Sequence, residues 1–302
     1  MSILLALIIA LFAFLATVSI VLFIVGPVIL LQPRRRTAEF YHALNLPITP
    51  SDVGLTYEEI NVITAEGLKL NGWLIKAVAP AKGTILYLHG VADCKIDGIR
   101  HAKLLHDQGY NIFLYDARRH GNSDGKFCTY GFYEKHDVLR VIDYLVSRTD
   151  MTLGKIGIFG TSMGAAVALQ AASLDKRIAA VVAENSFATL RSIFDDYQKR
   201  IIKLPFHFLR NIVIVRSELM AHFKASDVSP IEAVKTIRIP LLFIYGTNDH
   251  LIKHQYSIAL HEQATGSKEL FPVEEASHNN IWQIAGKEYE HKLLNFFNKT
   301  LS

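Results

Sequence analysis

Cysteine and metal-binding motifs are scarce in this sequence. Cys94 and Cys128 are the only cysteines among 302 residues, too few for the disulfide framework of a small secreted protein, so we expect free thiols. The chain has no CxxC pair, no HExxH motif and no GxxxxGK[ST] loop. These absences argue against a zinc site and against the commonest nucleotide-binding loop, so we expect neither a metal nor a cofactor.

The sequence also lacks the excess of basic residues that marks nucleic-acid binding. Its formal net charge is +4, and three of its 32 Lys and Arg residues are the consecutive Arg34, Arg35 and Arg36. The other 29 nearly balance the 28 Asp and Glu residues. We therefore expect no nucleic-acid partner, and the sequence identifies no protein partner.

Charged residues are absent from Ile3 to Leu31, a run rich in Leu, Ile, Val, Phe and Ala. About 20 such residues span a bilayer as a helix, so we predict a transmembrane anchor over residues 1–32. A cleaved signal peptide is the alternative, but its usual basic start is missing and the run is about twice as long as a normal signal core. Three arginines follow the run directly, which predicts a single-pass membrane protein with its main domain in the cytoplasm.

Residues 54–302 fit one large domain, after a polar linker over residues 33–53. Short apolar runs typical of strands alternate there with amphipathic runs typical of helices, the pattern of a mostly parallel sheet covered on both faces. We predict an α/β fold with an eight-stranded sheet that opens with an antiparallel pair. The expected strands are residues 57–64, 68–78, 84–88, 111–115, 155–159, 179–183, 241–245 and 270–273.

The stretch from about residue 188 to 234 interrupts this alternation. A simple connection between two parallel strands needs far fewer residues, so we predict an inserted cap. Apolar residues alternate in it with Arg and Lys. Two interpretations remain open: helices that cover the core, or a lid that binds acyl chains or faces a membrane.

A nucleophile motif stands at Gly160-Thr161-Ser162-Met163-Gly164, which has the G-x-S-x-G pattern. A strand-like run leads into it and a helix-like run of small residues follows. Such an elbow exposes the serine hydroxyl at the edge of the sheet, and the helix N-terminus favours developing negative charge. A second match at residues 121–125 lacks this context, so we interpret Ser123 as a turn residue and Ser162 as the nucleophile.

A serine hydroxyl needs an imidazole to accept its proton and a carboxylate to orient that imidazole. Asp249 follows the expected strand 241–245, and His278 follows the last expected strand. The order serine, aspartate, histidine is the one that accompanies a strand-to-helix elbow. We predict that His278 is the base and that Asp249 orients it, with Glu184 as the alternative acid.

Acyl transfer also needs hydrogen-bond donors for the oxyanion of the tetrahedral intermediate. The usual donors are the backbone N–H after the nucleophile and another from the loop after an early strand. Met163 holds the first position, and Val91 holds the second because it follows His89-Gly90 at the end of the strand 84–88. We predict an oxyanion hole formed by these two N–H groups.

These motifs resemble the alpha/beta-hydrolase superfamily, and within it membrane-anchored serine hydrolases similar to monoacylglycerol lipases and lysophospholipases. The resemblance covers about Leu68 to Phe297. It depends on the segments 86–90 (LYLHG), 116–123 (DARRHGNS), 160–164 (GTSMG), 240–249 (PLLFIYGTND) and 277–280 (SHNN). The resemblance implies the fold and the triad but not the substrate.

Two segments depart from the family pattern. Residues 117–120 are Ala-Arg-Arg-His where relatives often have aromatic-Arg-Gly-aromatic, and Val91-Ala92-Asp93 replaces the more usual small or amide-rich oxyanion loop. Both segments border the expected active site, so they affect access to its pocket. Neither removes a member of the triad.

The combined pattern predicts a serine hydrolase of the carboxylesterase or lipase type, which cleaves carboxylic ester or thioester bonds through an acyl-enzyme. The anchor and the apolar cap favour lipophilic acyl groups, so the expected partners are a small-molecule or lipid ester substrate and the membrane. Two alternatives use the same fold: a serine peptidase or amidase with the same triad, and a non-catalytic binding protein.

Overall fold

The fold is built on one eight-stranded sheet, seen in a computed structural model that describes residues 2–78, 80–201 and 207–301. The strands are β1 (Glu58–Ile63), β2 (Lys69–Ile75), β3 (Gly83–Leu88), β4 (Asn111–Tyr115), β5 (Lys155–Thr161), β6 (Ile178–Glu184), β7 (Leu241–Gly246) and β8 (Lys268–Val273). Their order in the sheet is β1-β2-β4-β3-β5-β6-β7-β8. The pairs β1–β2 and β2–β4 are antiparallel and the others parallel, so the sheet is mixed. The predicted α/β fold with eight strands, mostly parallel, is confirmed.

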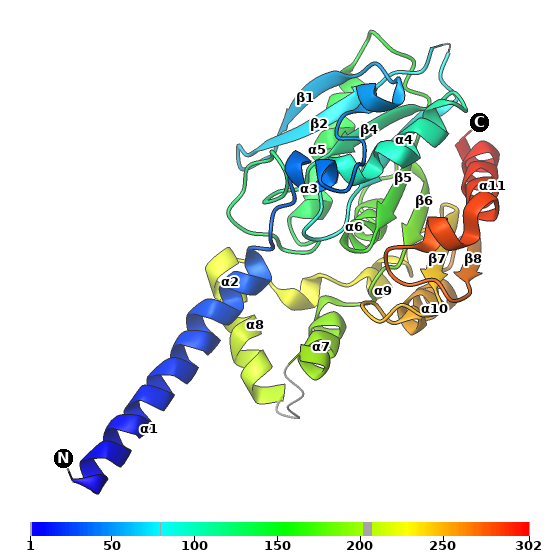
Figure 1. The fold of residues 1–302 in the computed structure, drawn as a ribbon. Helices are drawn as coiled ribbons and strands as arrows, with labels where there is room; N and C mark the ends of the chain where they lie inside the picture. The colour runs from blue at the N-terminus through cyan, green and yellow to red at the C-terminus, as the bar shows by residue number, and fades with distance from the viewer. Residues whose placement is uncertain (1, 79, 202–206, 302) are drawn as a thin grey trace.

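Helices cover both faces of this sheet (Figure 1). They include α4 (Ile99–His106), α5 (Glu134–Ser147), α6 (Met163–Ala172), α10 (His254–Gln263) and α11 (Ile281–Leu301). Successive residues of a strand point to opposite faces, so Ile158 of β5 packs in the cluster with α5 and α6 while Phe159 packs with α4 and α11. The central strands are buried on both faces for this reason, and they are almost wholly apolar.

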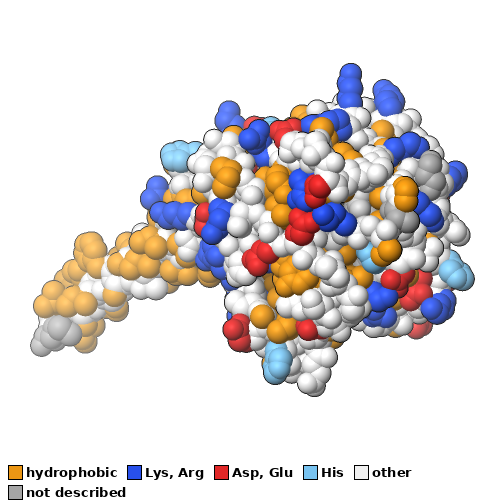
Figure 2. Space-filling view, turned by 90° about the horizontal axis from the view of Figure 1, so that it is seen from above, with side chains coloured by type: hydrophobic (Ala, Val, Ile, Leu, Met, Phe, Trp, Pro, Cys, Tyr) orange, Lys and Arg blue, Asp and Glu red, His pale blue; other side chains and the backbone are white. Residues whose placement is uncertain are grey.

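A long apolar helix projects from the body of the molecule (Figure 1). It runs from Ile3 to Leu31 as α1 (Ile3–Ile20), a π-helical turn η1 (Val21–Val25) and α2 (Gly26–Leu31). Its 29 residues rise about 43 Å, more than the roughly 30 Å of a bilayer's hydrocarbon core. Figure 2 shows hydrophobic side chains covering this projection, whereas charged side chains gather on the body. The helix is therefore long and apolar enough to cross a membrane.

The segment between β6 and β7 forms α7 (Leu190–Ile201), α8 (His207–Ala221), η4 (Ala225–Asp227) and α9 (Pro230–Ala233). It spans the residues 188–234 for which the sequence predicts a cap, and residues 202–206 of that range lie outside the described residues. Helix α8 packs against α2 and η1 (Figure 1). A side chain at Gly26 would crowd the methyl groups of Val213, which explains the close approach of the two helices.

A proline in α2 leaves a backbone carbonyl free for a second contact with α8. Pro27 has no N–H, so the carbonyl of Phe23 one turn earlier loses its usual helical donor. The Nε of Arg216, on α8, donates to that carbonyl at 3.4 Å. Helix α8 and the N-terminal helix are thus joined by packing and by a hydrogen bond.

The segment after the N-terminal helix is attached to the main domain. It carries the short helices α3 (Ala38–His42) and η2 (Pro50–Val53). The carbonyl of Leu31 accepts a hydrogen bond from Cys128 N at 2.8 Å, and that of Leu30 accepts one from the Tyr130 hydroxyl at 2.7 Å. Leu31 itself is buried. The end of the apolar helix is therefore held against the loop that precedes α5.

Candidate active site

Ser162 lies at a sharp turn between β5 and α6, at the carboxyl edge of the sheet. Its backbone has φ 52° and ψ −115°, a conformation that a residue with a side chain adopts only under constraint. The Ser162 N–H donates to the carbonyl of Glu184 on β6 at 2.8 Å, which holds the turn. A Cβ on Gly160 would overlap the carbonyl of Gly164, and a Cβ on Gly164 would overlap that of Leu88. The glycines of the motif are therefore required by close backbone packing.

Asp249 and His278 meet at the same edge of the sheet, after β7 and β8. The Nδ1 of His278 donates to Asp249 Oδ2 at 2.6 Å. The other oxygen of Asp249 accepts hydrogen bonds from the N–H groups of Leu251 at 2.7 Å and Ile252 at 2.9 Å. The Asp249 side chain is fully buried, whereas that of His278 is 13% exposed. The carboxylate is thus fixed, and the imidazole it orients retains access to solvent.

Asn185 joins the loops that carry these residues, although no sequence motif marks it. It follows β6 and is buried, with a left-handed backbone at φ 51°. Its Nδ2 donates to the carbonyl of His278 at 3.1 Å, and its Oδ1 accepts from the N–H of Gly246 at 3.2 Å. The neighbouring Glu184 carbonyl holds Ser162, so one short segment contacts the loops of all three triad candidates.

The Ser162 hydroxyl and the His278 imidazole are not hydrogen-bonded to each other in the described part of the chain. In enzymes without bound substrate this bond is often long, and it shortens in the complex. The structure therefore brings Asp249 and His278 into contact, and residues 184–185 connect the His278 loop to the Ser162 turn.

The alternative acid, Glu184, has a different partner. The Tyr289 hydroxyl donates to Glu184 Oε2 at 2.7 Å, while Asp249 takes the Nδ1 of His278. Burial raises the pKa of Glu184 to about 7, although the Tyr289 hydroxyl acts in the opposite direction. Glu184 is thus a buried group that supports the sheet edge through α11, and Asp249 is the carboxylate that contacts His278.

The loop after β3, which carries Val91, lies against the Ser162 turn. A Cβ on Gly90 would lie 3.4 Å from the Cβ of Ser162. The N–H of Met163 is the first of α6, so it has no partner within the helix. The two predicted donors, Val91 and Met163, therefore belong to the two segments that border the serine side chain.

Two buried histidines connect this loop to the loop after β4. The N–H of Ala92 donates to His120 Nε2 at 3.1 Å, and the N–H of Ala117 donates to His89 Nε2 at 2.9 Å. Burial, together with the adjacent His89, lowers the pKa of His120 to about 4, so this ring is neutral near pH 7. A neutral ring can accept through Nε2 while its Nδ1 donates to the carbonyl of Arg118 at 2.9 Å.

The unusual residues 117–120 therefore have structural partners. Arg118 is buried and donates to both oxygens of Asp137 at 2.7 and 2.6 Å, a geometry that only a guanidinium provides. His120 supports the Val91 loop through Ala92. A histidine in a loop gave no sign of this role, since its partner lies 28 residues away in the sequence.

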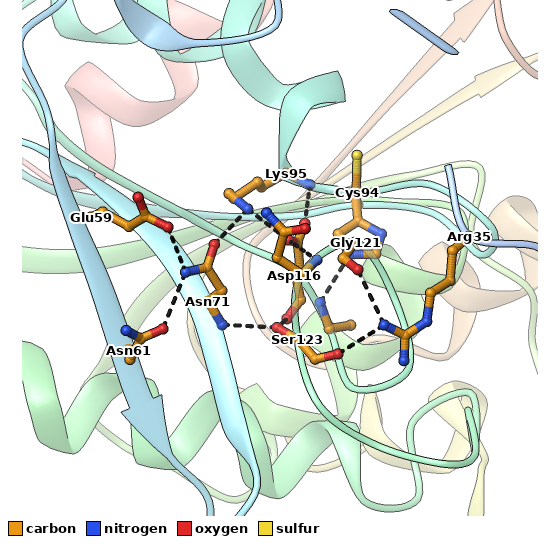
Figure 3. Close-up of polar contacts among 12 residues, drawn as sticks. Arg35, Glu59, Asn61, Asn71, Cys94, Lys95, Asp116, Gly121 and Ser123 are labelled. Atoms are coloured by element: carbon orange, nitrogen blue, oxygen red, sulfur yellow. Dashed lines mark hydrogen bonds and ion pairs between the residues drawn. The ribbon is translucent and has the colours of Figure 1, made fainter. Parts of the chain in front are cut away.

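Ser123, the serine of the second G-x-S-x-G match, is buried in the same loop. Its hydroxyl donates to the Asp116 carbonyl at 2.6 Å and accepts from the N–H of Asn71 at 2.8 Å. Asp116 in turn forms a buried ion pair with Lys95 at 2.6 Å (Figure 3). Ser123 thus stabilises a loop, as the sequence context indicated.

Comparisons with known proteins agree with this architecture. Residues 83–227 match the family described as alpha/beta hydrolase fold. Protein YqkD of Bacillus subtilis is 33% identical over 217 residues, which cover 71% of this chain and 70% of that protein. The membrane protein YNL320W of Saccharomyces cerevisiae is 26% identical over 77% of each chain.

Solved structures include an esterase with a similar fold. The Pyrococcus furiosus esterase Pf2001 is 27% identical and has a TM-score of 0.71, covering 84% of this chain and 96% of that one. The esterase neighbour and the family match together support a hydrolase activity. By its fold, its family match and its identity to YqkD, the chain belongs to the alpha/beta hydrolase family.

Proposed function

We propose that the chain is a serine hydrolase that cleaves carboxylic ester or thioester bonds, with Ser162 as nucleophile, His278 as base and Asp249 as the group that orients the base. The observation that carries this proposal is the 2.6 Å hydrogen bond from His278 Nδ1 to Asp249. The strained Ser162 turn, which residues 184–185 link to the His278 loop, supports it. A carboxylate only accepts hydrogen bonds, so the proton is on Nδ1 and Nε2 is free to accept another.

The proposed reaction has two steps. In the first, Ser162 Oγ attacks the carbonyl carbon while its proton moves to His278 Nε2, and the carbonyl oxygen becomes an oxyanion bound by the N–H groups of Val91 and Met163. The bond to the leaving group then breaks, and His278 protonates the departing alcohol or thiol. In the second step, water loses a proton to His278 and attacks the acyl carbon. The bond from that carbon to Ser162 Oγ then breaks, His278 returns the proton to Oγ, and the acid is released.

The cap supports a preference for lipophilic acyl groups. One side of α8 is buried at Ile214 and Ser217, while Phe208, Val215 and Leu219 are 70%, 51% and 63% exposed. Large exposed apolar side chains on a helix beside an apolar anchor suit a lipid surface or a lipid substrate. This arrangement favours the second of the two interpretations of the cap.

The anchor also supports a specific organisation of the chain. We assign residues 1–32 to a single membrane anchor, 33–53 to a linker and 54–302 to the catalytic domain with the cap at about 188–234. Arg34 to Arg36 at the end of the anchor favour a cytoplasmic catalytic domain. Protease protection tests this orientation in sealed vesicles whose cytoplasmic face is outside. We expect added protease to cleave the catalytic domain in intact vesicles, and cleavage only after the membrane is opened would refute the orientation.

A fluorophosphonate probe tests the nucleophile. The wild-type protein is expected to be labelled, Ser162→Ala to lose all labelling, and Ser123→Ala to retain it in the fraction that folds. Labelling that persists in Ser162→Ala would refute the assignment. A folded wild-type protein that resists the probe would favour the non-catalytic alternative.

Matched substrates test the bond and the acyl group. We expect turnover of esters to rise from acetyl to long acyl chains, and ester hydrolysis to exceed that of amides with the same acyl group. Equal or better turnover of acetyl esters would count against the lipophilic preference. Faster cleavage of the amides would identify a peptidase or amidase instead.

A further inference from the structure

The segment that follows the apolar helix contacts the predicted oxyanion loop directly. Arg36 Nη1 donates to Asp93 Oδ2 at 2.5 Å, and the Tyr41 hydroxyl donates to the other oxygen of the same carboxylate. The Arg36 guanidinium also lies over the ring of Phe40, 4.5 Å from its centroid. Only 13% of the Asp93 side chain is exposed. Both oxygens of a largely buried carboxylate are therefore held by residues 36–41.

Asp93 is part of the turn that presents Val91. Its N–H donates to the carbonyl of Gly90 at 3.3 Å, closing a turn around residues 91 and 92, and Asp93 Oδ1 also accepts from the N–H of Cys94 at 3.0 Å. Ala92 has a left-handed backbone at φ 62°, which costs conformational energy for a residue with a Cβ. Such a turn keeps its shape only when its neighbours fix it.

The opposite side of the turn is fixed indirectly by the same segment. Ala92 donates to His120, and the backbone after His120 is held by Arg35. The Arg35 guanidinium donates to the carbonyls of Gly121 and Ser123 at 3.2 Å each (Figure 3), and to that of Gly125 at 3.3 Å. Three carbonyls of one loop thus converge on one side chain.

We propose that Arg36 and Tyr41, acting through Asp93, are positioning residues that hold the Val91 N–H in place for the oxyanion. This inference rests on the proposed function, because it assigns a role to residues outside the triad in the same reaction. The segment next to the membrane anchor would then support the active site directly. Only four residues separate the end of the anchor helix from Arg36.

The proposal predicts a specific kinetic effect. Oxyanion donors stabilise the transition state only if they are fixed before the charge develops, whereas they contribute little to binding the uncharged ester. Loosening the turn should therefore lower kcat and leave KM nearly unchanged. Complete removal of one donor typically costs about 10²–10³ in kcat, so a displaced donor should cost about tenfold or more.

The test uses the full chain in detergent micelles, with the variants Arg36→Met and Tyr41→Phe. Arg34→Met is the matched control, because it removes the same charge two residues from Arg36, at a side chain that is exposed. Turnover is expressed per serine titrated by a fluorophosphonate. The affinity of a trifluoromethyl ketone, which forms an oxyanion on the same serine, is measured as Ki.

We expect kcat per titrated serine to fall about tenfold or more in both variants, Ki to rise in the same proportion, and KM to stay within about twofold. Arg34→Met should match the wild type, and Arg36→Lys should recover part of kcat because an ammonium can still pair with Asp93. A purely structural effect would lower the titrated fraction and leave kcat per serine and Ki unchanged.

Several outcomes overturn the inference. Unchanged kcat per serine and Ki in Arg36→Met and Tyr41→Phe would do so, as would an equal loss in Arg34→Met. Should Arg36→Met fail to fold, Tyr41→Phe decides, since it removes only a hydroxyl. Failure of the proposed function is distinguishable, because the wild type itself would then react neither with the fluorophosphonate nor with esters.

Discussion

Replacing Asn185 tests whether the loops of the triad depend on one buried amide. Asn185→Ala removes the hydrogen bonds to the His278 carbonyl and from the Gly246 N–H, worth about 0.5–1.5 kcal/mol each. It also places alanine in the left-handed backbone conformation at φ 51°, which costs about 1 kcal/mol more. We therefore expect the free energy of unfolding to fall by about 2–4 kcal/mol.

Asn45 provides a matched control. It has a similar backbone, at φ 55°, but it is exposed and lies in a surface turn. Asn45→Ala should lose only the backbone contribution, about 1 kcal/mol, and Asn45→Gly should be close to neutral. Asn185→Gly avoids the cost of the left-handed backbone but still loses both hydrogen bonds, so it should remain about 1–3 kcal/mol less stable than the wild type.

Denaturant unfolding of the wild type and the four variants measures these differences, and turnover per titrated serine measures the catalytic effect. A shift of about 1 Å in the His278 loop can reduce the rate about a hundredfold, so we expect kcat to fall in both Asn185 variants. Equal stability losses at Asn185 and Asn45, or full kcat in Asn185→Ala, would refute the reasoning.

Further substitutions address the triad, the ion pairs and the buried acid. Asp249→Asn should lower kcat about 10⁴-fold with little change in stability, because His278 loses the partner that selects its tautomer; undiminished turnover would exclude Asp249. Lys95→Met leaves the buried Asp116 carboxylate without its cation and should cost about 3–5 kcal/mol in urea unfolding, whereas the exposed Lys103→Met should cost at most about 0.5. Burial raises the pKa of Glu184 to about 7, so its contribution to stability is present at acid pH and is lost as pH rises towards 7. Glu184→Gln should make the decline in stability between about pH 4.5 and 7 shallower by at most about 1.4 kcal/mol per pH unit, and an unchanged profile would contradict this.

Hydrophobic patterning determined much of the fold. The central strand β4 (Asn111–Tyr115) has the predicted bounds, because a strand buried on both faces is almost wholly apolar, here with Asn111 as its one polar residue. β8 begins at Lys268, two residues before the expected run, since its first residues are only partly buried at the sheet edge. Edge residues need not be apolar, so sequence pattern alone sets their limits poorly.

The sequence by itself determined the features that depend on neighbours along the chain: the strands, the glycines of the serine turn, and the order of Ser162, Asp249 and His278. Contacts across the fold were decided only by the tertiary structure. Arg36 and Asp93 are 57 residues apart, and Asn185 and His278 are 93 apart. A lone arginine or asparagine carries no periodicity, so its partner depends on strand order and on which loops meet at one edge of the sheet.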